Sequence, residues 1–489
     1  MIEAGVEVEH LEFGIGRVVS VLSDIATVDF FGEKMDVDAD ELHPRLNSAD
    51  TASPPLGAQS VTDLAFRKVF EAINAGVVPG DPQRLVDLTI GGKKMAAEIA
   101  DLLKEAPTTG VCRIYMGYYG SGKSHHLGVL KSVALRDGWV TASLELDPKA
   151  ADPAKPSTVY QALMSGLDFP ARADGSQSFD FFDLVKEIRN NWAKISTLPY
   201  VKRSPWFGQG LKAILYLTHR RDDADYVSAV NWLAGQMKQI GTIRSLSWRA
   251  GFKDKIPSMP QNKNTGVVYA YNLVVLHEIL KALGYKGLAI IIDEAEHVRT
   301  YSVNRYLRAN NFFDVLARCA HLPRSDLKDP EDDYKYFDLP PFWREGPHFA
   351  LFVGLTEGAD THDLRRKAGE MSVLIHDESD VVRLAPPDAA AYENWVLEFL
   401  GRCAEHLGPR VQILTDLEVR TRIVGTLRHN FEQTPIDERI LRNWTKLAGL
   451  VPAVLMNQER EIGADELVET VNSAARQVAG ETLPWDDDD

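Results

Sequence analysis

The chain carries the segment Arg113-Ile-Tyr-Met-Gly-Tyr-Tyr-Gly-Ser-Gly-Lys-Ser124, in which residues 117–124 have the spacing G-x-x-x-x-G-K-S of a phosphate-binding loop. Residues 111–116 form a short apolar run typical of a strand, and residues 124–135 have the composition of a helix. A glycine-rich loop between a strand and a helix points backbone N–H groups and the positive end of the helix dipole at phosphate oxygens. The segment therefore predicts that the chain binds a nucleoside triphosphate.

The loop and the residue that follows it supply the predicted nucleotide contacts. These positions are Gly117, Tyr118, Tyr119, Gly120, Ser121, Gly122, Lys123, Ser124 and His125. The ammonium group of Lys123 is expected to reach the β- and γ-phosphates and to act in catalysis, and the hydroxyl of Ser124 is expected to bind Mg²⁺. The alternative, a glycine-rich turn with a surface lysine, does not account for the strand and the helix on either side.

A second segment, Gly287-Leu-Ala-Ile-Ile-Ile-Asp-Glu-Ala-Glu296, has the pattern of a fully buried parallel strand that ends in carboxylates. At its end, Asp293 is predicted to hold Mg²⁺ through water, and Glu294 is predicted to orient and deprotonate the attacking water. Glu296 and His297 are expected either in a second layer or at the surface. Buried strands often end in acidic residues, so this segment is informative mainly because it follows the phosphate-binding loop in the same chain.

The next predicted strand, residues 349–355, ends at Thr356. A polar residue at this point is expected to lie between the phosphate-binding loop and the acidic strand, where it could sense the γ-phosphate and take part in catalysis. The alternative is a threonine that merely ends a strand.

The order of these segments predicts an α/β fold with a parallel sheet covered by helices, an AAA+-type P-loop core followed by a helical lid. A further strand is expected at residues 381–384, and the helices of the lid at about residues 389–406, 414–428, 436–447 and 464–478. The predicted boundaries are 62–385 for the ATPase core, 386–478 for the lid and 479–489 for an acidic tail.

Two helices are predicted upstream of the loop, at about residues 63–75 and 93–104. Between them, Val77, Val78 and Leu88 are candidates for packing against adenine. Ordinary core packing explains these three side chains equally well.

Four arginines are candidates for action on the γ-phosphate. Arg439 and Arg442 lie on a predicted lid helix and could reach the nucleotide of their own chain. Arg365 and Arg366 follow the predicted sensor strand and could act on the nucleotide of a neighbouring copy in a homo-oligomer. Surface positions are the alternative for all four.

Residues 1–46 contain short runs of strand-forming residues separated by Gly, Asp and Ser, a pattern that resembles SH3-like barrels. Barrels of that kind often contact RNA polymerase or nucleic acid. This segment holds eleven acidic residues against Arg17, Lys34 and Arg45, a net charge of −8, which favours a protein partner over nucleic acid. A solvated acidic cap without a specific partner is the alternative. Residues 47–61 have the composition of a linker.

The tract from about residue 189 to 263 differs in charge from the rest of the chain. It holds thirteen Lys and Arg against four Asp, a net charge of +9, with nine aromatic residues interleaved. Charge for phosphates and rings for stacking are what contact with DNA requires, with residues 200–207 and 244–255 as the favoured loops. Contact with a protein partner, or a core of aromatics under a solvated face, are the alternatives; Trp232 and Tyr216 are expected in the core.

The composition of the whole chain indicates a cytoplasmic location. The net charge of −16 over 489 residues argues against nucleic-acid binding by the whole molecule, though not by one face. Three scattered cysteines, Cys112, Cys319 and Cys403, are too few for a disulfide framework and fit a reducing compartment. The N-terminus lacks the pattern of a signal peptide, and no run of about eighteen apolar residues is present to span a membrane.

Three segments together resemble the BREX-system ATP-binding proteins, BrxD-like P-loop proteins of bacterial phage-defence clusters. They are Arg67-Lys-Val-Phe-Glu-Ala-Ile-Asn-Ala-Gly-Val-Val-Pro79, then Gly117-Tyr-Tyr-Gly-Ser-Gly-Lys-Ser124, then Ile292-Asp-Glu-Ala-Glu296. The first is the discriminating one, since many ATPases share the other two. The resemblance covers residues 62 to about 450 and leaves the N-terminal segment outside. It implies a core similar to AAA+ ATPases of the origin-recognition type, a role in anti-phage defence, and other defence-system proteins as partners.

Residues and resemblance together predict a Mg²⁺-dependent ATPase that converts ATP to ADP and phosphate and drives assembly or remodelling in a defence system. Two alternatives stay open. One is a nucleotide-dependent switch or scaffold with little turnover. The other is a DNA loader of the origin-recognition type, for which the basic tract is the support.

Overall fold

The computed structural model of the chain divides into two compact units, Met1–Ser60 and Val61–Asp489. The structure describes residues 7–10, 14–22, 25–30, 33–38 and 42–44 of the first unit. Of the second unit it describes residues 61–79, 82–171, 178, 180–217, 224–236, 240–249, 251–254, 256, 258–260, 265–323, 329–330, 339–356, 378–385, 387–435, 440–457, 460 and 462–480.

The first unit is an antiparallel sheet with the strand order β4-β3-β2-β1-β5. Its strands are β1 (Glu7–His10), β2 (Gly14–Leu22), β3 (Ile25–Phe30), β4 (Glu33–Asp38) and β5 (Leu42–Pro44). In the part of this unit that the structure describes, no pairing between β4 and β5 closes the sheet. The SH3-like barrel therefore stays a prediction.

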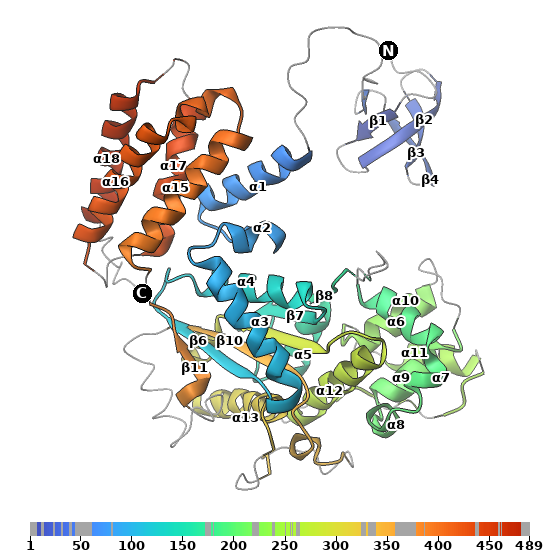
Figure 1. The fold of residues 1–489 in the computed structure, drawn as a ribbon. Coiled ribbons are helices and arrows are strands. Elements are labelled where there is room, and N and C mark those ends of the chain that lie inside the picture. Colours follow the sequence, from blue (N-terminus) through green and yellow to red (C-terminus); the bar gives the residue numbers. More distant parts are fainter. Residues whose placement is uncertain are drawn as a thin grey trace. The chain divides into compact units, whose positions relative to one another are not determined.

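The second unit is built on a six-stranded, mostly parallel sheet with the order β11-β6-β10-β9-β7-β8 (Figure 1). Its strands are β6 (Cys112–Gly117), β7 (Val140–Glu145), β8 (Leu167–Asp168), β9 (Leu288–Asp293), β10 (Ala350–Thr356) and β11 (Val381–Arg383). The short strand β8 is the antiparallel member. The α/β fold with a parallel sheet is thereby confirmed. Strands β6, β9, β10 and β11 lie within two residues of their predicted ends, whereas β8 was not predicted.

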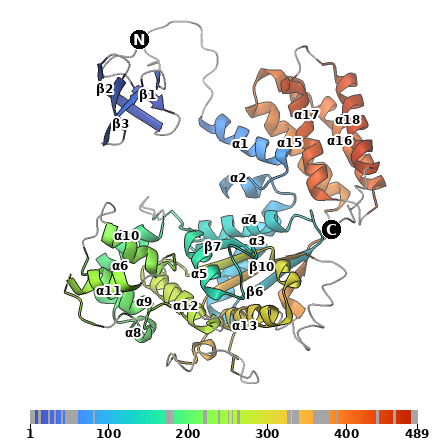
Figure 2. The ribbon, with the colours of Figure 1, turned by 180° about the vertical axis from the view of Figure 1, so that it is seen from behind.

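Side chains of the central strands alternate between two cores because successive residues of a strand point to opposite faces. Ile290 and Ile292 of β9 belong to one buried cluster, whereas Ala289 and Ile291 belong to the other. The first cluster is covered by α5 (Pro156–Ser165), α12 (Gly266–Ala282) and α13 (Val303–Ala320), and the second by α3 (Gly92–Thr109) and α4 (Lys123–Arg136). Figure 2 shows the helices of both layers with the sheet between them.

The basic tract between β8 and α12 is a group of short helices. These are α6 (Phe181–Asn190), α7 (Trp192–Ile195), α8 (Pro199–Arg203), α9 (Phe207–Ile214), α10 (Ala224–Leu233) and α11 (Ile240–Arg249). Trp206, Phe207 and Trp232 are buried in the same apolar cluster as the strands. The tract is therefore part of the main core, and the charged side chains that the structure describes in it are exposed or half-buried.

The C-terminal helical region is confirmed as a separate apolar cluster. It contains α15 (Ala389–His406), the 3-10 segment η6 (Pro409–Thr415), α16 (Leu417–Gln433), α17 (Leu441–Asn457) and α18 (Ala464–Gly480). Helix α1 (Val61–Ala75) joins this cluster through Phe66 and Phe70, although it precedes the sheet in sequence. A short helix that was not predicted, α2 (Pro82–Asp87), follows it. The indole N–H of Trp395 donates to the carbonyl oxygen of Leu88 at 2.7 Å, which ties the cluster to the start of the sheet domain.

Among the described helices, none is long and apolar enough to cross a membrane. The three cysteines are buried and unpaired with one another. Burial raises the pKa of Cys112 and Cys403, so both thiols stay protonated and act as small apolar side chains.

Candidate active site

The phosphate-binding loop connects β6 to α4, and two of its glycines are required by backbone geometry. Gly120 and Gly122 have φ angles of 74° and 92°, in the left-handed region that favours glycine. A side chain at Gly117 would overlap the hydroxyl of Ser121. Helix α4 begins at Lys123 directly after Gly122, so the positive end of its dipole faces the loop.

Lys123 lies inside the loop rather than on the surface, with 8% of its surface exposed. Its Nζ donates to the carbonyl oxygens of Gly117 and Tyr118, both at 3.1 Å. Burial lowers the pKa of Lys123, while the carboxylates of Glu296, Asp293 and Glu294 act in the opposite direction. The ammonium group of the loop and the acidic end of β9 therefore face the same space.

The acidic end of β9 is held close to β10. Asp293 is buried, with 7% of its surface exposed, and any side chain at Gly354 of β10 would overlap its Oδ1. The backbone N–H of Glu294 donates to this same Oδ1 at 2.9 Å. Asp293 thereby keeps one carboxylate oxygen fixed by the backbone, and its position suits a carboxylate that binds a cation through water.

Glu294 has a φ angle of 59°, and no other non-glycine residue described here has a positive φ. Such backbone conformations are costly and concentrate at functional sites, because the surrounding structure must hold them. Burial raises the pKa of Glu294, helped by Glu296 and Asp293, while His297 and Lys123 oppose the rise. The His297 Nε2 lies 3.6 Å from a carboxylate oxygen of Glu294. A carboxylate of raised pKa at the end of this strand is suited to accept a proton.

Thr356 occupies the predicted place between the two halves of the site. It is the last residue of β10 and pairs in register with Gly117, the first residue of the loop. Its backbone N–H donates to Glu296 Oε2 at 3.1 Å, and its hydroxyl donates to Glu296 Oε1. Glu296 is therefore a contact of the candidate sensor, a role that the sequence left undecided between a second layer and the surface.

We expect Thr356→Val to lower the rate of ATP hydrolysis by roughly 10- to 100-fold and to leave ATP affinity within a few-fold, because the hydroxyl would act on the γ-phosphate after leaving Glu296. Thr356→Ser keeps the hydroxyl and is the matched control. Steady-state phosphate release and an ATP titration measure the two quantities. Equal rates for the Val and Ser variants would show that the hydroxyl has no part in turnover.

His125 and His126 of α4 lie beside the loop and are half-buried. The hydroxyl of Thr89 and the His125 Nε2 are 2.6 Å apart, and the His126 ring lies 4.2 Å from that of Tyr115. Burial lowers the pKa of both histidines to about 4. His125 packs against the segment that follows α2, so its predicted contact with the nucleotide stays a prediction.

Acidification is expected to destabilise the protein through these histidines. Because their pKa is lower in the folded chain than the unfolded value of about 6.5, the unfolded chain binds protons first, and stability is lost as the pH falls from 6.5 toward 4. Each could contribute about 1–2 kcal/mol of this loss at pH 5. Thermal unfolding of wild type and His126→Phe at pH 7.5 and pH 5 measures it. The Phe variant should lose less stability, and an equal loss would contradict the assignment.

The start of α17 lies against the loop. A Cβ added at Gly122 would lie 3.5 Å from Leu441, one added at Gly120 would lie 2.6 Å from Ile440, and the Arg442 Nη1 donates to the Tyr119 hydroxyl at 3.2 Å. Of the four candidate arginines, the structure thus places Arg442 at the loop. The other three, Arg365, Arg366 and Arg439, lie outside the described residues.

The candidates for adenine packing separate into two groups. Val77 and Val78 are exposed, and Val78 lies beside Gly128 of α4, one turn beyond the loop. Leu88 is buried in the C-terminal helical cluster. The two valines keep their candidate role, and core packing accounts for Leu88.

Most aromatic side chains of the basic tract are in the core. The favoured loop 200–207 consists largely of the helix α8 and the buried pair Trp206 and Phe207. Tyr216 was expected in the core and is exposed; this prediction was wrong, because its helical context did not show that α9 ends at Ile214. Trp248 is 58% exposed, and the Lys253 Nζ lies 4.0 Å from the centre of its ring.

The residues present fit ATP with Mg²⁺. The Ser121 hydroxyl is buried and has no hydrogen-bond partner among the described residues, as expected for a group that would bind a phosphate oxygen. Lys123 is bonded to loop carbonyls that a phosphate would replace. Ser124 is exposed at the first turn of α4, and Asp293 supplies a hard oxygen ligand.

The chain was compared with known proteins. A model of the family described as BREX system ATP-binding protein BrxC/D matches residues 61–183 and 180–324, together more than half of the chain. The match includes the phosphate-binding loop, Asp293 and Glu294, and it ends before Thr356 and the C-terminal helices. No curated protein matched the chain, and no solved structure matched its fold.

Proposed function

Because the chain belongs to the BREX system ATP-binding protein BrxC/D family, we propose that it is a Mg²⁺-dependent ATPase that converts ATP to ADP and phosphate in an anti-phage defence system. One observation carries this proposal. The loop that holds the buried Lys123 and the acidic end of β9 meet at Thr356, which pairs in register with Gly117 and donates its backbone N–H to Glu296 Oε2 at 3.1 Å. Binding of ATP alone requires the loop, whereas the acids are what hydrolysis needs in addition.

The proposed roles of the site residues are phosphate binding, Mg²⁺ binding and activation of water. The N–H groups of the loop and Lys123 would bind the phosphates, and Ser124 and Asp293 would hold Mg²⁺, which supplies charge neutralisation when bound. Glu294 would orient a water molecule and take its proton, for which its raised pKa is favourable. Thr356 and Arg442 would contact the γ-phosphate from β10 and from α17.

In this proposal, Lys123 and Thr356 exchange hydrogen-bond partners when ATP binds, and this exchange links binding to catalysis. Lys123 must leave the carbonyl oxygens of Gly117 and Tyr118 to reach a phosphate, and Thr356 must leave Glu296 to reach the γ-phosphate. The start of α17 lies on the loop, so nucleotide binding would also displace the Arg442–Tyr119 contact. Nucleotide state would in this way move the helical region and drive assembly or remodelling of a partner complex.

A switch with little turnover is the second candidate. The contacts just described favour it, because they are already made within the chain and would have to be broken before hydrolysis. Phosphate release with and without EDTA, measured beside ATP affinity, separates the two. Tight binding with turnover below about one per hour would establish the switch.

A DNA loader is the third candidate, and the exposed Trp248 with Lys253 over its ring is the observation that favours it. Turnover raised by double-stranded DNA, together with salt-sensitive binding, would support it. Other defence-system proteins are the proposed partners of the acidic N-terminal unit, and we propose a cytoplasmic location and assembly into a homo-oligomer.

A further inference from the structure

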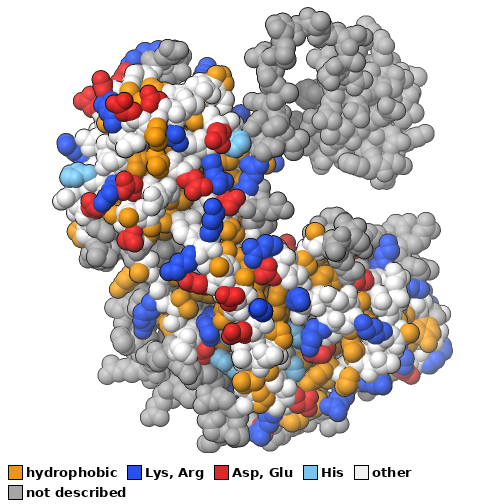
Figure 3. Space-filling view, in the orientation of Figure 1, with side chains coloured by type: hydrophobic (Ala, Val, Ile, Leu, Met, Phe, Trp, Pro, Cys, Tyr) orange, Lys and Arg blue, Asp and Glu red, His pale blue; other side chains and the backbone are white. Residues whose placement is uncertain are grey.

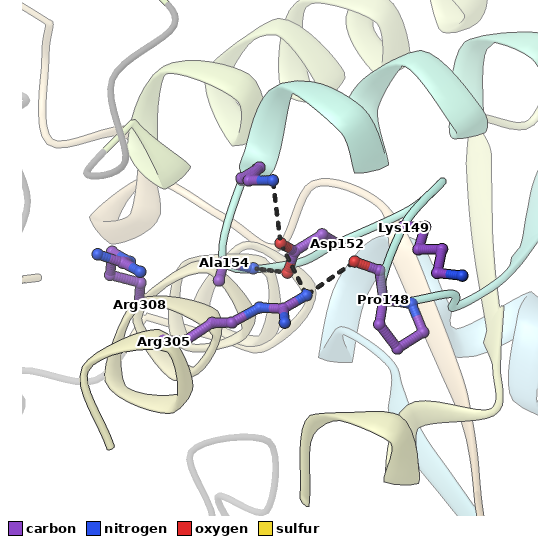
Figure 4. A pocket seen from close by; sticks show the side chains of 7 residues that line it. Pro148, Lys149, Asp152, Ala154, Arg305 and Arg308 are labelled. Carbon is purple, nitrogen blue, oxygen red and sulfur yellow. Dashed lines mark hydrogen bonds and ion pairs between the residues drawn. The ribbon is translucent and has the colours of Figure 1, made fainter. Parts of the chain in front are cut away.

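A cavity of about 350 Å³ lies at the edge of the sheet where β7 and β9 end (Figure 4). It is lined by Pro148, Lys149, Asp152, Ala154, Lys155, Arg305 and Arg308. The first five follow β7, and the two arginines belong to the first turns of α13. Four cations around one carboxylate give the cavity a local charge of +3 in a chain of −16. By contrast, basic side chains on the face shown in Figure 3 are dispersed among acidic and apolar ones.

A buried ion pair builds one wall of the cavity. Asp152 is 1% exposed, and its carboxylate accepts the N–H of Ala154 at 3.0 Å and lies 3.1 Å from Arg305 Nη2. The same Nη2 donates to the carbonyl oxygen of Pro148 at 2.7 Å, and the guanidinium of Arg305 lies 3.7 Å from the centre of the Tyr301 ring. Arg305 is thus fixed in place by three contacts and positions the wall.

The two lysines, Lys149 and Lys155, face the open side, whereas Arg308 is half-buried. The Nζ of Lys155 is 3.9 Å from Asp152, and its side chain is 62% exposed. Lys149 is exposed, and the Nε of Arg308 is buried without a hydrogen-bond partner in the described part of the chain. Figure 4 shows Arg308 beside the cavity without a marked interaction. A buried guanidinium nitrogen without a partner is costly, and it points to a ligand that supplies acceptors.

Two helices begin at the cavity as well. Lys155 is the residue before α5, and Arg305 lies in the first turn of α13. The positive ends of both helix dipoles therefore add to the four side chains. An acceptor-rich anion is the ligand that this arrangement favours, and arginine forks match the oxygens of a phosphate group.

We propose that this cavity binds the phosphodiester backbone of a nucleic acid. Exposed lysines at the mouth and Arg308 deeper inside suit a run of phosphates better than one enclosed ion. On the same helix, Val303 is 69% exposed and Leu307 is 46% exposed, which gives sugars or bases an apolar surface to contact. The site is separate from the Trp248 surface of the basic tract, and nucleic acid is bound here by charge without reading of sequence.

The cavity is also connected to the candidate catalytic base. Arg305 stacks on Tyr301, which follows directly on the 3-10 segment η2 (Ala295–Thr300), and Glu294 immediately precedes that segment. Phosphate groups that bind beside Arg305 would therefore act on η2 through Tyr301, and with it on Glu294 and Glu296. This coupling rests on the proposed ATPase activity, whereas the binding itself does not.

The test uses the full chain and a fluorescein-labelled 30-base-pair DNA duplex, with binding followed by fluorescence anisotropy without nucleotide. Lys149→Ala, Lys155→Ala and Arg308→Ala together should raise the Kd at 50 mM KCl at least 10-fold. The slope of log Kd against log salt should fall by about 2.7, since each phosphate contact contributes about 0.9. The control removes three exposed lysines of α3, Lys93, Lys94 and Lys104, and should change little.

Three results would overturn the proposal. Equal loss of affinity in the triple variant and its control would mean that total charge alone binds DNA. Unchanged affinity in both would remove the cavity from DNA binding. Competition at the cavity by poly-glutamate or pyrophosphate that exceeds competition by unlabelled duplex would assign it to an acidic protein segment or a small anion.

Turnover is measured in the same samples, with thermal unfolding as the check on folding. The triple variant should keep the basal rate of ATP hydrolysis and lose its stimulation by the duplex. If the wild-type protein hydrolyses no ATP but binds the duplex through these residues, the proposed function fails while the binding site stands. If turnover is present and stimulation is the same in both proteins, the coupling is wrong.

Discussion

Lys123→Ala is expected to lower the affinity for Mg²⁺·ATP by at least about 100-fold. Two charge-assisted hydrogen bonds to phosphate oxygens are lost, each worth roughly 1.5–3 kcal/mol. The ammonium group is also the cation that opposes the charges of three carboxylates in the site. Without it, the negative charges of Asp293, Glu294 and Glu296 would repel the triphosphate. Isothermal titration with Mg²⁺·ATP measures the effect.

Lys94→Ala is the matched control for this change, because Lys94 is an exposed lysine of α3 outside the site. Its affinity for ATP should equal that of the wild type. Unfolding temperature shows whether the Lys123 variant keeps its fold, since the lost contacts to Gly117 and Tyr118 are confined to the loop. A folded Lys123→Ala protein with wild-type ATP affinity would refute the nucleotide site.

Glu294→Gln should retain ATP binding and lower turnover by at least about 100- to 1,000-fold. Glutamine keeps the shape and the hydrogen-bonding oxygen of glutamate but cannot accept a proton from water, and a positioned general base contributes 10²–10⁴ in rate. Removing one of several neighbouring carboxylates also reduces repulsion of the triphosphate, so affinity should hold or rise slightly. Phosphate release under single-turnover conditions, beside titration with Mg²⁺·ATP, measures both.

The pH profile gives a second measurement on the same residue. Burial and the neighbouring carboxylates raise the pKa of Glu294 above its ordinary value. The base acts only when it is deprotonated, so the rate should fall with decreasing pH at a higher pH than for an exposed glutamate. The residual rate of Glu294→Gln should not show this fall of the rate at low pH. If the variant keeps both the rate and this fall, another group is the base.

The sequence was sufficient to predict most strands of the sheet and to locate the two segments of the candidate site, because these depend on local patterns. The loop glycines, the apolar run before Asp293 and the helix after Ser124 are each contained in a dozen residues. The contact of Thr356 with Glu296 could not be predicted, because it joins the end of β10 to the 3-10 segment after β9, and the register of these two strands is set by the whole sheet. The sequence shows that Glu296 lies two residues after Glu294, the candidate base, but it does not show whether the Glu296 side chain is buried or exposed.

For the basic tract, by contrast, the local sequence pattern did not predict which aromatic side chains are buried. The same alternation of aromatic and basic residues is expected whether the rings stack on nucleic-acid bases or pack in the protein core. Only the tertiary structure distinguishes these two possibilities. Trp206 and Phe207 are buried in the main cluster, whereas Trp248 is exposed. The cavity beside α13 could not be predicted from the sequence either. Lys149 and Lys155 are far from Arg308 in the chain, and the parallel pairing of β7 and β9 brings them to one edge of the sheet.

Helix α1 gives the C-terminal helices an attachment that their place in the sequence does not reveal. Because α1 packs among them, the chain connects this helical body to the sheet domain at two places: residues 76–91, where Leu88 is still buried among the helices, and residues 384–388. A body held by one connection can swing and twist in any direction, whereas two connections define an axis. Rotation of the helical body about the line through these two connections is the motion that stretches neither connection. By this hinge rotation about a single axis, the start of α17, which carries Arg442, would move toward and away from the phosphate-binding loop.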